Sequence, residues 1–150
     1  MKLKAEEKML VENLLTQEEL CTEKYKFYAK QAKDPQLKEL FEKIGKNERQ
    51  HCDLLTNLKD GRLPERIEKE AKAEKYEPSG QYKGSAADKK QDCFLCTDSI
   101  ATEKYVASAY NNDLFRFAAV EARNLLNSIE TDEQNHAEMI YLYKSANQMV

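Results

Sequence analysis

Two short segments of this chain place a histidine three residues after a glutamate: Glu48-x-x-His51 and Glu133-x-x-His136. These are the only two histidines in the sequence. Residues three apart on an α-helix share a face, so each segment can direct a carboxylate and an imidazole to one point. Each segment also lies in a stripe of apolar residues, where an unpaired charge is costly. A metal ion would offset that cost, and oxygen and imidazole ligands suit iron or manganese, with zinc as an adventitious occupant.

The composition favours one helical domain. The chain has 150 residues, of which 34% are charged, with 4 glycines and 3 prolines, and this balance is typical of helices with solvated outer faces. The net charge of −3 gives no general attraction for nucleic acid. No apolar run is long enough for a membrane span or a signal peptide. We therefore expect a cytoplasmic protein without nucleic-acid or membrane partners, in which the four cysteines are reduced thiols.

Apolar residues at steps of three or four predict four helices, over about 5–33, 35–60, 92–118 and 120–147. Asp34 and Pro35 mark the start of the second helix, because aspartate caps helices and proline suits the first helical position. Gly61 marks the end of that helix, and Asp92 is the expected cap of the third.

The segment between the second and third helices, 61–91, is expected to be a connection with a short helix at 65–76. Two antiparallel hairpins joined by one long crossover form an all-α, ferritin-like four-helix bundle. We therefore predict a single ferritin-like domain over 1–150.

An internal repeat suggests the remaining candidate ligands. The tetrapeptide Thr-Glu-Lys-Tyr at 22–25 recurs at 102–105, an offset of 80, whereas Glu-x-x-His recurs at an offset of 85. The offset of 80 pairs Glu18 on the first helix with Asp98 on the third. The predicted inward polar set is Glu18, Glu48, His51, Asp98, Glu133 and His136. It matches the ligand pattern of dimetal bundles, and its four carboxylates would balance two divalent ions.

Two further features have both a functional and a structural interpretation. Tyr25 and Tyr105 are either core aromatics or hydrogen-bond donors to the ligand carboxylates. Cys93-x-x-Cys96 lies at the predicted start of the third helix, where a helix N-terminus lowers a thiol pKa. A redox role for this pair therefore stands beside a purely structural one, and a single pair cannot complete a four-sulfur metal site.

The first hairpin resembles rubrerythrin and bacterioferritin in Glu18, in the stretch Tyr25-Lys26-Phe27-Tyr28-Ala29 and in Glu48-x-x-His51. The second half, from Asp98 to His136, is similar to the spore coat F-like branch of the ferritin-like superfamily. The resemblance implies a carboxylate-bridged centre of two iron ions, with Glu48 and Glu133 bridging and with Glu18 and Asp98 as terminal ligands. It also implies hydrogen peroxide or oxygen as the oxidant, an external electron donor and a homodimer.

The sequence departs from rubrerythrins in ways that weaken the peroxidase interpretation. Asp98 stands where glutamate is usual, Ala101 stands where a further third-helix glutamate is expected, and the paired Cys-x-x-Cys motifs of a rubredoxin do not follow. Three functions stay open: an oxidoreductase of the peroxidase or ferroxidase type, a structural spore coat protein with a vestigial metal site, and iron storage.

Overall fold

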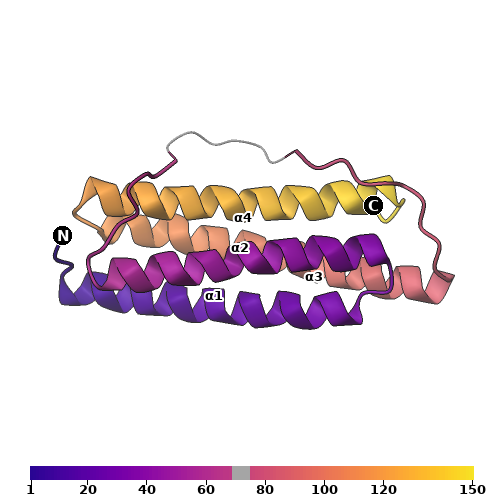
Figure 1. The fold of residues 1–150 in the computed structure, drawn as a ribbon, viewed down its shortest axis with the longest axis horizontal. Helices are drawn as coiled ribbons and strands as arrows, with labels where there is room; N and C mark the ends of the chain where they lie inside the picture. Colours follow the sequence, from indigo (N-terminus) through magenta and orange to yellow (C-terminus); the bar gives the residue numbers. More distant parts are fainter. Residues whose placement is uncertain (69–74) are drawn as a thin grey trace.

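The computed structural model describes residues 1–68 and 75–150, and this part of the chain forms four long α-helices and one 3-10 turn (Figure 1). The helices are α1 (Ala5–Gln31), α2 (Pro35–Lys59), α3 (Ala86–Asp113) and α4 (Val120–Ala146), with the turn η1 (Leu114–Arg116) between the last two. Helix α1 packs mainly on α2, and α3 packs mainly on α4, while α1 also contacts α3 and α2 contacts α4. The predicted ferritin-like bundle of two hairpins is thereby confirmed.

The connection between the hairpins sets the direction of the helices. The chain leaves α2 at one end of the bundle and enters α3 at the opposite end, so that α2 and α3 run the same way (Figure 1). Residues 65–68 and 75–76 are not helical. The rest of the short helix predicted at 65–76 lies outside the described residues. In that described part, no helix has the length and apolar character needed to cross a membrane.

The helix starts follow local side-chain chemistry. Asp34 caps α2 by accepting a hydrogen bond from the backbone N–H of Gln36 (3.2 Å), with Pro35 at the first position, as predicted. Helix α3 starts earlier than expected, because Ser85 is its cap and accepts from the backbone N–H of Asp88 (3.1 Å). The prediction of Asp92 as this cap was therefore wrong.

Asp92 instead lies inside α3 and is buried. Its carboxylate accepts hydrogen bonds from the backbone N–H groups of Lys33 (2.8 Å) and Asp34 (2.9 Å), in the turn between α1 and α2. Glu7 in α1 does the same for the other hairpin, accepting from the backbone N–H of Ala118 (2.9 Å). Asp92 is related to Glu7, and Ala118 to Lys33, by the same sequence offset that relates the two Glu-x-x-His segments. The two hairpins thus hold each other's turns through equivalent residues.

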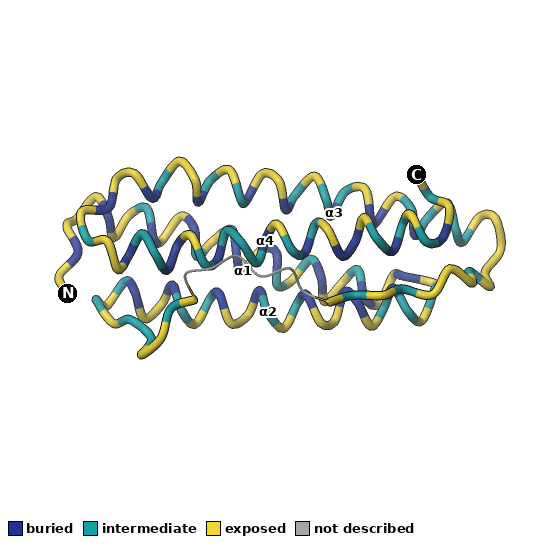
Figure 2. The backbone as a smooth tube through the Cα atoms, turned by 90° about the horizontal axis from the view of Figure 1, so that it is seen from above, coloured by how far each residue is buried: buried dark blue, intermediate teal, exposed yellow. Residues whose placement is uncertain are grey.

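The buried residues recur at regular intervals along each helix (Figure 2). Two apolar clusters fill the bundle, one around Leu14, Leu55 and Leu126 and the other around Phe41 and Ile140. Along α2, α3 and α4, the buried charged residues described below stand between the residues of these two clusters, and in α1 Glu18 lies near the boundary between them. The fold therefore encloses a polar layer between two apolar layers.

Candidate metal centre

All four helices contribute buried ionisable residues to one layer of the bundle. Each of these residues is at most 1% exposed. They are Glu18 from α1, Glu48 and His51 from α2, Glu103 from α3, and Glu133 and His136 from α4. So many carboxylates and imidazoles would be unstable in an apolar interior unless something compensates their charge.

The six residues form two overlapping groups, and within each group one ligand atom per residue lies within 4.8 Å of the others. The first group, called the His51 position, consists of Glu18, Glu48, His51 and Glu133. The second, called the His136 position, consists of Glu48, Glu103, Glu133 and His136. Two carboxylates belong to both groups, and this is the geometry of a carboxylate-bridged dimetal site.

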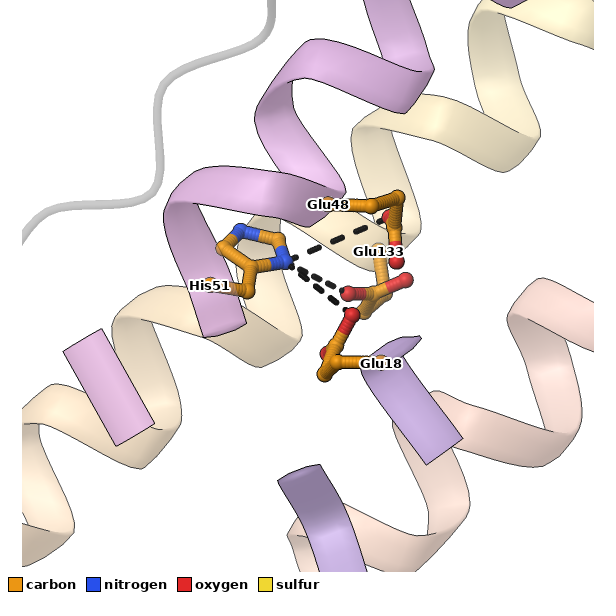
Figure 3. A group of neighbouring side chains, drawn as sticks. All are labelled: Glu18, Glu48, His51 and Glu133. Atoms are coloured by element: carbon orange, nitrogen blue, oxygen red, sulfur yellow. Dashed lines mark ion pairs between the residues drawn. The ribbon is translucent and has the colours of Figure 1, made fainter. Parts of the chain in front are cut away.

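At the His51 position, the imidazole Nδ1 points at three carboxylates (Figure 3). It lies 3.0 Å from Glu133 Oε1, 3.5 Å from Glu18 Oε2 and 4.0 Å from Glu48 Oε1. At the His136 position, the equivalent Nδ1 lies 2.8 Å from Glu48 Oε1, 3.4 Å from Glu103 Oε1 and 3.7 Å from Glu133 Oε2. Both imidazoles therefore direct the same nitrogen into the cluster.

The outer nitrogen of each imidazole has an acceptor on the other hairpin. Nε2 of His51 lies 2.8 Å from Asp132 Oδ2, and Nε2 of His136 lies 2.7 Å from Asn47 Oδ1. The amide nitrogen of Asn47 donates to Gln50 Oε1 (3.1 Å), which is consistent with its oxygen facing the imidazole. A neutral imidazole that carries its proton on Nε2 presents a lone pair at Nδ1. Both histidines thus present an Nδ1 lone pair that could bind a metal ion.

Two buried tyrosines orient the carboxylates of α1 and α3. The hydroxyl of Tyr110 donates to Glu18 Oε1, and that of Tyr25 donates to Glu103 Oε1, both at 2.5 Å. Burial and the adjacent carboxylates raise the pKa of both tyrosines, so they stay protonated donors. The second oxygen of each carboxylate makes no hydrogen bond and remains open toward the cluster.

Asp98 does not reach this cluster. Its side chain is 41% exposed and pairs with Lys24 Nζ (2.6 Å), while the hydroxyl of Tyr28 donates to it (2.8 Å). Burial alone would raise the pKa of Asp98, but these two partners lower it. Tyr105 is 68% exposed and stands away from the core. The structure thus places Glu103 and Tyr110 where the sequence predicted Asp98 and Tyr105.

Asp98 and Tyr105 were predicted because the internal repeat was aligned at the wrong offset. Glu103 is related to Glu18, and Tyr110 to Tyr25, by the same offset that relates the two Glu-x-x-His segments. The recurrence of Thr-Glu-Lys-Tyr at an offset of 80 is out of register with this relation. Five residues correspond to about 140° around a helix, so Asp98 and Glu103 point to different sides of α3. Extending the Glu-x-x-His offset to the first and third helices would have found both missed residues.

The pair of cysteines in α3 is not at a helix start. Helix α3 begins at Ala86, so Cys93 and Cys96 lie well inside it, and all four cysteines of the chain are free. Cys96 is buried in the apolar cluster, and burial raises its thiol pKa. The thiol of Cys93 donates to the carbonyl of Met149 (3.6 Å). These contacts support the structural interpretation, because the helix-terminus argument for a reactive thiol no longer applies.

The charges of the metal-free cluster are balanced by protons. Burial and neighbouring carboxylates raise the pKa of Glu48 well above its usual range, and burial and Glu133 raise that of Glu103 to about 8. Burial would lower the pKa of both histidines, but the carboxylates that surround them raise it. Burial would also raise the pKa of Glu133, yet the closeness of Glu103 and the two histidines holds it low.

The residues present fit a pair of divalent ions. Among the described residues, twelve buried side-chain nitrogen or oxygen atoms make no hydrogen bond, and eight of these belong to the six cluster residues. Buried polar atoms without partners are rare in folded proteins, so their concentration here marks a place for a missing ligand. Four carboxylates carry −4, two divalent ions carry +4, and neutral imidazoles complete the set.

The comparison with known families agrees with this geometry. A model of the family described as rubrerythrin matches residues 10–143, most of the chain. The chain therefore belongs to the rubrerythrin family, and its buried Glu and His side chains have the arrangement of a dimetal carboxylate site. No curated protein and no solved structure matches closely enough to add to this assignment.

Proposed function

We propose that this chain binds two iron ions and reacts with hydrogen peroxide or oxygen as a dimetal oxidoreductase. The observation that carries the proposal is the set of eight buried, unpartnered ligand atoms that converge from all four helices. Glu48 and Glu133 would bridge the ions, because both belong to both groups. Glu18 and Glu103 would be terminal ligands, and each histidine would bind through Nδ1.

When bound, a pair of ferrous ions supplies one electron from each ion to an oxidant, and an external donor restores the ferrous state. The protein's own side chains would hold the ions and would bind or release protons. Tyr25 and Tyr110 keep one oxygen of Glu103 and Glu18 engaged, which limits how these carboxylates rotate. Protons held by Glu48 and Glu103 in the metal-free state would leave when ions enter.

A surface cavity adjoins the centre at His136. It has a volume of about 310 Å³ and lies between α2 and α4, lined by Asn47, Asp132 and His136 among others.

The position three residues after Glu103 is occupied by Val106. This chain therefore lacks the additional third-helix glutamate of rubrerythrins also when α3 is aligned with α1 by the offset of 85. Because this absence weakens the peroxidase interpretation, we propose oxygen as an oxidant beside peroxide.

Anaerobic titration of the metal-free protein with Fe(II) tests the binding step. We expect two ions per chain, binding that weakens as pH falls because protons compete for the ligands, and loss of both ions in a His51→Ala/His136→Ala double variant. Asp98→Asn is the matched control, because Asp98 lies on the same helix as Glu103 but outside the cluster. Wild-type binding no stronger than that of the double variant would contradict the proposal.

Stopped-flow absorbance tests the reaction. The Fe(II)-loaded protein should react with peroxide or oxygen faster than free Fe(II) at the same concentration, because two electrons are available at one place. A loaded protein that is inert to both oxidants would refute the oxidoreductase function and leave a structural role for the metal.

A further inference from the structure

The two histidines of the centre have unequal partners at equivalent places. Asn47 directly precedes Glu48, and Asp132 directly precedes Glu133, so these two residues occupy equivalent places in the repeat. Each accepts from the outer nitrogen of the histidine on the opposite helix: Asp132 from His51 at 2.8 Å, and Asn47 from His136 at 2.7 Å. One imidazole is therefore held by a carboxylate and the other by a neutral amide.

This is a difference in charge at nearly constant geometry. The six cluster residues and the two buried tyrosines form equivalent pairs that are chemically identical: glutamate with glutamate, histidine with histidine, and the two tyrosines that donate at 2.5 Å. The distances to the two outer acceptors, 2.8 and 2.7 Å, are nearly equal. The presence of aspartate in place of asparagine adds one negative charge behind His51 and none behind His136.

We infer that the two ion positions are unequal, and that the His51 position fills first and holds its ion more tightly because Asp132 stands behind His51. This inference rests on the proposed metal centre and adds an order of filling to it. A carboxylate that accepts a ligand histidine's N–H makes the imidazole a more electron-rich ligand and fixes its orientation. An amide oxygen fixes the orientation but adds no charge.

The surroundings of Asp132 indicate how large a difference in metal affinity we expect between the two positions. Loss of an outer hydrogen-bond partner of a ligand histidine changes metal affinity about ten- to hundredfold. The side chain of Asp132 is 40% exposed, and Lys43 and Lys46 line the same cavity, so solvent and these cations screen part of its charge. We therefore expect the two binding steps to differ by about tenfold, the low end of that range.

The chain offers its own matched variants, because each position can receive the residue of the other. Asp132→Asn keeps an acceptor for His51 and removes only the charge, whereas Asn47→Asp adds a charge behind His136. Anaerobic titration with Co(II), followed by its visible absorption, gives a dissociation constant for each step. Single His51→Ala and His136→Ala variants assign the steps, since we expect the tight step to survive only in His136→Ala.

In wild type we expect two resolved steps. Asp132→Asn should weaken the tight step about tenfold, Asn47→Asp should tighten the weak step, and the double exchange should reverse the order of filling. Metal-free melting temperatures within a few degrees of wild type would show that the exchanges act on binding. Two ions that bind with indistinguishable constants in wild type, or a separation that neither exchange changes, would overturn the inference while leaving the dimetal centre intact. Absence of Co(II) binding above the double histidine variant would instead refute the centre itself.

Discussion

Replacing Glu103 by glutamine should make the stability of the metal-free protein less dependent on pH. Glu103 is buried beside Glu133, and both effects raise its pKa to about 8 from the ordinary value of 4.5. Between these two values the folded protein holds a proton that the unfolded chain has lost. The stability of the wild type therefore falls as pH rises from about 4.5 to 8, and Glu103→Gln removes this contribution.

The magnitude follows from the two pKa values. Each pH unit between them corresponds to about 1.4 kcal/mol of folding free energy. Between pH 5.5 and 9 the wild type should therefore lose about 3 kcal/mol more than Glu103→Gln. For a domain of this size, that difference corresponds to roughly 6–12 °C in melting temperature. Both histidines also have raised pKa values, and stability from that source is likewise lost as pH rises.

Thermal and urea unfolding followed by circular dichroism, after removal of metal by a chelator, would measure this effect at pH 5.5, 7 and 9. Asp98→Asn is the control, because the pKa of Asp98 is lowered and its ionisation is complete across this range. We expect Asp98→Asn to run parallel to wild type and Glu103→Gln to lie above it at pH 9. Parallel curves for wild type and Glu103→Gln would show that Glu103 does not share the cluster.

Three other changes test separate contacts. Tyr110→Phe should weaken Fe(II) binding about ten- to hundredfold by removing the hydrogen bond to the α1 carboxylate, whereas Tyr105→Phe should leave it unchanged; equal effects in an equilibrium titration would contradict the assignment. Asp92→Ala should cost about 3 kcal/mol in urea unfolding, because two backbone N–H groups lose their acceptor, and a cost under about 1 kcal/mol would argue against this tie. Gly45→Ala should change stability by less than about 1 kcal/mol in the same assay, because the gain in helix propensity of about 1 kcal/mol offsets the crowding of an added Cβ 3.3 Å from Cβ of Tyr25; a cost above about 2 kcal/mol would show that the α1–α2 contact cannot relax.

The sequence was sufficient for the bundle and for five of the six residues of the centre because these depend on local patterns. Glu48 and His51 lie in an apolar stripe whose period fixes the face of α2, and the same is true of Glu133 and His136 in α4. In α3 the pattern is weaker. Polar residues precede and follow Glu103 directly, so hydropathy alone does not separate the face of Glu103 from that of Asp98. The prediction then followed the tetrapeptide match at an offset of 80 and not the offset of 85 that relates the two Glu-x-x-His segments.

Contacts between helices could not be predicted from the sequence, for a different reason. The pairing of His51 with Asp132 joins α2 to α4, and the pairing of Tyr110 with Glu18 joins α3 to α1. Each requires knowledge of which helices are neighbours and of how far one is shifted along the other. Sequence periodicity gives the inner face of a helix, but it does not give the height at which a residue meets its partner.

The hydrogen bonds that orient the ligands cross from one hairpin to the other, and this has a consequence for assembly. A hairpin alone would carry one tyrosine, one Glu-x-x-His segment and one further glutamate, each deprived of its counterpart. The centre can therefore be completed only by association of two halves, and no cluster residue comes from the described part of the connection that follows α2. That connection supplies a high effective concentration of one half for the other. In this bundle, the connection affects how readily the two hairpins associate, whereas the side chains of the cluster determine which site their association forms.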